Sequence, residues 1–104
     1  MEAKEIQSLI ENPTYTKVMV IQRLINYKLK DPLYINLEIY PDGIIAEHTD
    51  TESWAEAETE YEAIDGLRIE IEDLYEHLKN TPDEQLGRNP LSWKRLLNSC
   101  VEEY

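Results

Sequence analysis

The spacing of apolar residues changes along the 104-residue chain, and each change predicts a different element. Apolar residues recur at helical spacing over residues 2–11 and again from Lys17 to Leu29, which predicts two helices. Asn12-Pro13 is expected to end the first helix and Asp31-Pro32 the second, because the residue before a proline is driven out of the helical region.

The period then changes to two. Apolar and polar residues alternate from Leu33 to Tyr40, as they do in a half-buried strand. Pro41-Asp42-Gly43 is a typical turn sequence, and the chain returns as a second apolar run from Ile44 to about Thr49. These features predict a β-hairpin over residues 33–49.

Residues 54–63 fit two structures. Glutamates stand at every second position, and this strict alternation favours a strand. Alternatively, Ser53 and Glu56 have the spacing of a capping box, which would start a helix at Trp54. Alanine and glutamate are weak strand formers, so the helix stays open as an alternative.

Two more helices are predicted in the C-terminal part. Asp65-Gly66 is interpreted as a break, after which a helix runs from Leu67 to about Leu78. Asn89-Pro90 is expected to open the last helix, as its cap and first helical residue. The predicted fold class is therefore α+β: a small antiparallel meander of two or three strands with about four helices packed on it, in a single domain over residues 1–104.

The composition indicates in which cellular compartment the protein is expected. The sequence contains no apolar run long enough to span a membrane. The first residues are charged and lack the apolar core of a secretory signal. A single cysteine, Cys100, cannot form an internal disulfide, which fits a reducing compartment. We therefore expect a cytoplasmic protein that does not contact membranes.

The sequence shows little catalytic machinery. Gly-rich phosphate loops and Gly-x-Ser-x-Gly elbows are absent, and Cys100 falls in the apolar stripe of the last predicted helix. In a strand, His48, Asp50 and Glu52 would project on one side, but this N/O/O set matches no defined metal loop. His77 follows Asp73 by four residues, a pair that usually stabilises a helix end. We predict no enzymatic activity, no catalytic residues, no cofactor and no metal.

Charge is the most informative feature. The formal net charge is −12, from 22 acids and 10 bases. Residues 47–76 contain one base, Arg68, and twelve of the acids: Glu47, Asp50, Glu52, Glu56, Glu58, Glu60, Glu62, Asp65, Glu70, Glu72, Asp73 and Glu76. Such a field repels nucleic acid and attracts basic surfaces, so we expect no direct binding of nucleic acid. A small domain needs a net charge of only about 2–8 in magnitude to be soluble, and soluble surfaces usually intersperse charges of both signs.

This acidic block suggests a recognition surface. If residues 54–63 form a strand, alternate carboxylates stand about 6.6 Å apart in a row, similar to successive phosphates of a nucleic-acid strand. In size and charge the chain resembles the small acidic phage proteins that inhibit restriction or CRISPR effectors. The resemblance implies an inhibitor or regulator that binds the basic surface of a nucleic-acid-handling protein. The predicted contacts are Glu56, Glu58, Glu60 and Glu62, followed by Glu70, Glu72 and Asp73.

Two alternatives remain. The chain could be an adaptor or accessory subunit that binds through apolar and aromatic surface, while its acidic face only solvates it. It could also form a homodimer, in which the basic segment 17–30 meets the acidic block of another copy or neutralises it within the same fold.

Overall fold

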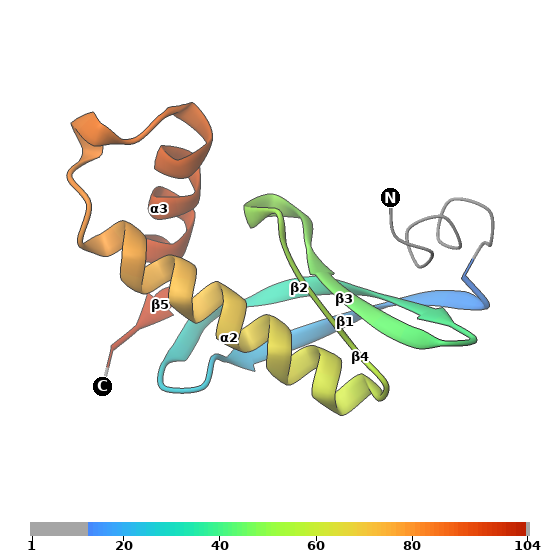
Figure 1. Ribbon diagram of the computed structural model, residues 1–104. Helices are drawn as coiled ribbons and strands as arrows, with labels where there is room; N and C mark the ends of the chain where they lie inside the picture. The colour runs from blue at the N-terminus through green and yellow to red at the C-terminus, as the bar shows by residue number, and fades with distance from the viewer. Residues whose placement is uncertain (1–12, 104) are drawn as a thin grey trace.

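The computed structural model describes residues 13–103 and shows an antiparallel sheet with two α-helices (Figure 1). The elements are β1 Tyr15–Arg23, β2 Lys28–Tyr40, β3 Gly43–His48, a 3₁₀ turn Thr49–Thr51, β4 Ser53–Ala57, α2 Glu60–Lys79, a 3₁₀ turn Asp83–Gln85, α3 Arg88–Cys100 and β5 Val101–Glu102. The strand order is β1-β2-β3-β4, and β5 pairs with the first residues of β2.

The α+β class is confirmed, but the predicted numbers of elements are wrong for the part of the chain that the structure describes. The sheet has five strands instead of two or three, and two α-helices are present instead of about four. The predicted helix over residues 2–11 lies outside the described residues. None of the described helices is long and apolar enough to cross a membrane.

The helix predicted from Lys17 to Leu29 is wrong, because this segment forms β1, a turn and the start of β2. Its Val-Met-Val-Ile run satisfies both helical and alternating spacing, and β-branched residues favour the extended form. Pairing with β2 decides between them: Met19 lies opposite Ile35 and Ile21 opposite Leu33. Asp31-Pro32 does not end an element but lies inside β2, near the point where the register with β1 shifts. Proline is tolerated in strands at such irregularities.

The predicted hairpin is confirmed. β2 and β3 are joined by the two residues Pro41-Asp42, and Tyr40 pairs with Gly43. Along β2, Leu33, Ile35 and Leu37 are buried on the inner face of the sheet, as the alternation predicts.

Neither structure predicted for residues 54–63 spans the whole segment, since β4 ends at Ala57 and α2 begins at Glu60. Thr59 caps the helix in place of Ser53: its Oγ1 accepts the Glu62 N–H at 3.2 Å, and its hydroxyl donates to Glu62 Oε1 at 2.9 Å. The predicted break at Asp65-Gly66 is wrong, because Gly66 lies inside α2. A Cβ at this position would lie 3.1 Å from Ala55 Cβ, so glycine allows α2 to pack closely on β4.

The core lies between the inner face of the sheet and the two helices. α2 is amphipathic, and its buried residues are Ala63, Leu67, Ile71, Tyr75 and Leu78. Figure 1 shows α2 crossing the strands, with α3 beside the C-terminal end of α2. The last predicted helix is confirmed as α3, although its N-cap is Gly87, and Asn89-Pro90 lies inside its first turn. Cys100 is buried, as its place in the apolar stripe predicts.

The outer face of the sheet carries exposed apolar side chains. Val18 and Tyr34 keep 63% and 66% of their surface accessible, and the register places them on strands β1 and β2 with side chains away from α2. Within residues 13–103, neither helix covers this face, because both pack on the opposite side.

Candidate functional site

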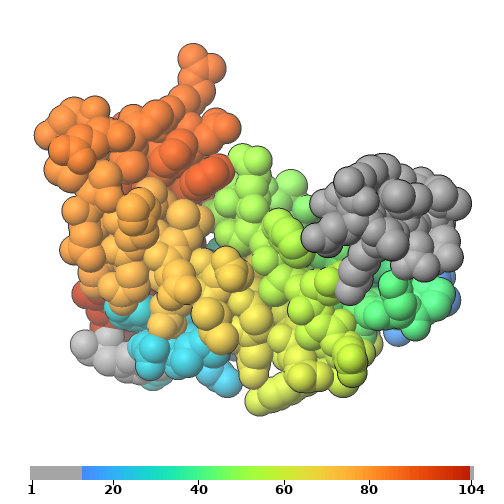
Figure 2. Space-filling view, viewed as in Figure 1, coloured from blue at the N-terminus to red at the C-terminus, as the bar shows by residue number. Residues whose placement is uncertain are grey.

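An open groove with a volume of about 830 Å³ lies between β4 and α2. These two elements lie side by side on the face of the molecule shown in Figure 2. The lining residues are Glu52, Ser53, Trp54, Ala55 and Glu56 from the β4 side, and Gly66, Ile69, Glu70, Asp73, Leu74 and His77 from α2.

The first wall of the groove is the edge of β4. Trp54 and Glu56 project to the outer face of the sheet, whereas Ser53 and Ala55 project to the inner face, yet all four line the groove. Residues from both faces can share one groove only if the groove follows the edge of the strand. Among the described strands, β4 is the last in the sheet and pairs with β3 alone.

The second wall is a single stripe of α2. Its residues follow one another at intervals of three, one, three, one and three positions, which places them on one side of a helix. This stripe lies next to the buried stripe that contains Leu67 and Ile71. α2 therefore packs on the sheet with one side and presents the adjacent side to the groove.

The groove is acidic and partly apolar. Four carboxylates line it, those of Glu52, Glu56, Glu70 and Asp73, and the lining includes His77 but neither lysine nor arginine among the described residues. Trp54 and Ile69 keep 60% and 49% of their surface exposed. A concave site with charges of one sign concentrates its field on a ligand of the opposite sign. An indole ring adds a favourable surface for a cation.

The structure brings three of the seven predicted contact residues, Glu56, Glu70 and Asp73, together in this groove. Glu58 lies apart, in a shallow depression beside the Pro41-Asp42 turn. The continuous row of four glutamates is not formed, because the chain changes from strand to helix between Ala57 and Glu60.

The other three predicted contacts have partners inside the fold. Glu60 forms an ion pair with Lys17 of β1 at 2.8 Å, and this contact raises the pKa of the lysine. Glu62 bonds to the N-cap residue of α2: its backbone N–H donates to Thr59 Oγ1, and its carboxylate accepts from the Thr59 hydroxyl. Glu72 accepts hydrogen bonds from the backbone N–H of Asn26 at 2.8 Å and from its Nδ2 at 2.6 Å. Glu60 and Glu72 therefore connect α2 to the β1–β2 side of the sheet, whereas the bonds of Glu62 stay within the N-terminus of α2.

The sequence did not predict Glu52, Ile69 or His77 as partner contacts, and it gave Trp54 only as one of several candidate aromatic anchors. One signal could have found the helix residues. Ile69, Asp73 and His77 recur at intervals of four, on a stripe separate from the apolar core stripe. This spacing places Ile69 on the same side of the helix as Asp73 and His77.

The candidate metal ligands are not assembled. His48 is buried, and its Nδ1 lies 2.6 Å from Thr51 Oγ1, which in turn lies 3.0 Å from Ser53 Oγ. Burial lowers the pKa of His48, against the opposing effect of Asp50. Within residues 13–103, no group of three or more His, Cys, Asp or Glu side chains is arranged to hold a metal ion.

Cys100 has the properties of a core residue. Burial raises the pKa of its thiol, whereas a nucleophilic cysteine needs a lowered pKa.

Comparison with known proteins gives no match: no family model fits the sequence, and no curated protein or solved structure is significantly similar to it.

Proposed function

We propose that this chain is a non-enzymatic interaction protein that binds a basic segment of a partner protein in the groove between β4 and α2, and thereby inhibits or regulates that partner. One observation carries the proposal: four carboxylates and two exposed apolar side chains line the same groove, without lysine or arginine among the described lining residues. Basic surfaces are typical of nucleic-acid-binding proteins, so the partner proposed is a nucleic-acid-handling protein.

The chemistry of the groove fits lysine and arginine side chains. Both have an apolar stem and a charged head, and the stem packs on apolar surface while the head reaches polar groups. Ile69 and Trp54 offer the apolar surface, and Glu70 and Asp73 offer the carboxylates. Arginine in addition stacks well on an indole ring.

The proposal divides the predicted contact residues into two groups. Glu56, Glu70 and Asp73 contact the partner directly, whereas Glu58 lies outside the groove, beside the Pro41-Asp42 turn, and is not expected to contact the partner. Glu60 and Glu72 act indirectly, because their bonds to Lys17 and Asn26 fix the position of α2. Glu62 also acts indirectly, because its bonds to Thr59 cap the helix.

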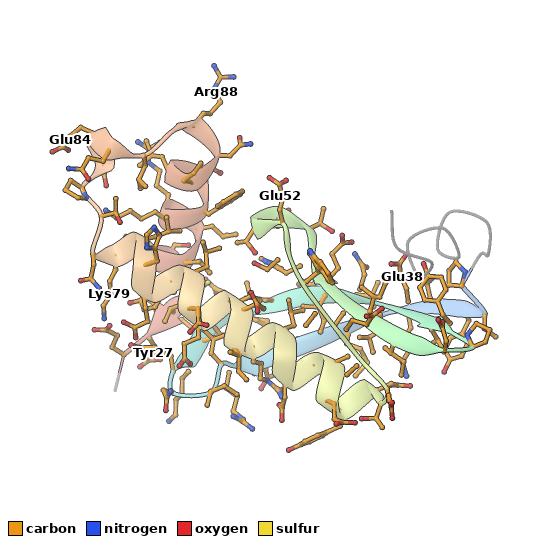
Figure 3. The ribbon with its side chains drawn as sticks, viewed as in Figure 1. Tyr27, Glu38, Glu52, Lys79, Glu84 and Arg88 are labelled. Atoms are coloured by element: carbon orange, nitrogen blue, oxygen red, sulfur yellow. The ribbon has the colours of Figure 1, made fainter. Side chains whose placement is uncertain are left out.

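Two triple variants of equal charge test this proposal. The groove variant is Glu56→Gln/Glu70→Gln/Asp73→Asn, and the control variant is Asp42→Asn/Glu84→Gln/Glu102→Gln, which removes three acids outside the groove. Figure 3 shows Glu84 at the far end of the molecule from β4. The partner is first isolated by affinity capture with the tagged chain, and its binding to each variant is then measured at several salt concentrations.

We expect the groove variant to bind about tenfold more weakly at low salt, and the control variant to bind as the native chain does. Equal losses in the two variants would mean that only net charge matters, which contradicts the proposal. Binding that is insensitive to salt and is abolished by Tyr34→Ala would instead support the adaptor alternative, with the outer face of the sheet as its contact surface.

A further inference from the structure

We infer that the bound segment adopts an extended conformation and adds to the sheet as a strand along the edge of β4 that lines the groove. This inference rests on the proposed function, because it concerns the same groove and the same class of basic ligand. It specifies the ligand further, as a strand with lysine or arginine at every second position.

The register of the sheet shows which backbone groups face the groove. The two-residue turn at Pro41-Asp42 makes Tyr40 and Gly43 a hydrogen-bonded pair. In antiparallel strands such pairs alternate, so Ile44, Ala46 and His48 direct their backbone groups towards β4. Their partners there are Ala57, Ala55 and Ser53.

It follows that the backbone N–H and C=O of Trp54 point the other way, along the edge that lines the groove. No backbone hydrogen bond of Trp54 to a turn, loop or helix occurs within residues 13–103. Such an edge is a template for another strand, and β-strand addition is a common mode of peptide recognition.

The charges around β4 select which strand can pair with it. Natural edge strands avoid unwanted pairing through charged residues. A second copy of β4 would bring Glu52 and Glu56 against the same acids of the first copy, which disfavours pairing between two copies through this edge. A basic strand meets the opposite charge, so the same carboxylates that oppose self-pairing favour the proposed ligand.

The two walls of the groove define the pattern of the ligand. Side chains of an added strand alternate between the outer face, beside Trp54, and the inner side, over α2. The inner residues therefore face Ile69, Glu70 and Asp73, where a lysine or arginine is favoured. Residues on the outer side contact the indole ring, where an aliphatic or cationic side chain is favoured.

Backbone methylation of a synthetic probe tests the inference. The probe is the peptide acetyl-Lys-Val-Lys-Val-Lys-Val-Lys-amide with a fluorescent label, and its binding to the full chain is measured by anisotropy. One derivative carries N-methyl groups on the lysines, and another carries them on the valines. A helical, alanine-rich peptide with the same four lysines serves as a charge-matched control.

In a strand, the N–H groups of successive residues point to opposite edges. The N–H groups of only one set, the lysines or the valines, can therefore face β4, and only their methylation removes hydrogen bonds to it. We expect one methylated derivative to bind about tenfold more weakly and the other to bind about as well as the probe, because only one set loses hydrogen bonds to β4. The helical control should bind weakly.

The results separate the two hypotheses. Equal binding of both methylated derivatives, or equally tight binding of the helical control, would overturn strand addition and leave the proposed function intact. Undiminished binding of the probe to the groove variant Glu56→Gln/Glu70→Gln/Asp73→Asn, or no binding to the native chain, would overturn both.

Discussion

His48 and Thr51 form a buried polar pair beneath the connection between β3 and β4, with 2.6 Å between His48 Nδ1 and Thr51 Oγ1. Burial lowers the pKa of His48, so the folded chain keeps the imidazole neutral at a pH where the unfolded chain, with a pKa of about 6.5, binds a proton. Below that pH, protonation favours the unfolded state. The free energy of unfolding should therefore fall as the pH drops from about 7 to 5.5.

The variant His48→Asn isolates this effect, because its amide can replace the hydrogen bond of Nδ1 and cannot titrate. We expect urea denaturation of His48→Asn to show a weaker loss of stability over the same pH range than the native chain shows. Asp50→Asn is the matched control: Asp50 raises the pKa of His48, so its removal should leave the pH dependence in place or steepen it. Identical pH profiles for the native chain and His48→Asn would contradict the prediction.

At the scale of elements, the features that depend on neighbouring residues could be predicted from the sequence, whereas the pairing of strands distant along the chain could not. The hairpin depends on alternation and on Pro41-Asp42, all within a few residues. Segment 17–29 satisfies two periods at once, and only the long-range pairing of β1 with β2 selects the strand. Similarly, the sequence identified Glu56, Glu70 and Asp73, but their meeting in one groove depends on the reversal of the chain between β4 and α2.

The start of α2 offers a test at the same scale. Thr59 is the N-cap of α2, and its side chain accepts the Glu62 N–H. Thr59→Ala removes this cap, and we expect it to lower the free energy of unfolding by about 1 kcal/mol. Thr59→Ser keeps the hydroxyl and should remain close to the native stability. Chemical denaturation of both variants measures the difference, and equal stability of the two would show that the cap contributes little.

At the scale of the whole molecule, the fold neutralises its acidic block unevenly. Three acids of the block form ion pairs within the described residues: Glu60 with Lys17, Asp65 with Arg68, and Glu76 with Lys79. Lys79 also pairs with Glu103, which lowers the pKa of that carboxyl. The described ion pairs thus do not include Glu70 or Asp73, two of the groove carboxylates. The basic residues of segment 17–30 therefore neutralise only part of the block, and charge remains concentrated beside β4.

This concentration of like charge predicts that the groove lowers the stability of the fold. Glu70 and Asp73 are three residues apart on α2, and such like-charge pairs destabilise a helix. We expect Glu70→Gln/Asp73→Asn to raise the free energy of unfolding by about 0.5 kcal/mol at low salt, and by less at high salt, where the repulsion is screened.

The same variant should bind the lysine-valine probe more weakly, so stability and binding move in opposite directions. Asp42→Asn/Glu84→Gln removes the same charge from exposed positions outside the groove and should change both quantities less.

Urea denaturation at two salt concentrations measures the stability of each variant, and probe anisotropy measures its affinity. A variant that gains stability without losing affinity would show that Glu70 and Asp73 only solvate the helix. A gain in stability with a loss of affinity is the result expected if these acids are placed for binding at a cost to the fold.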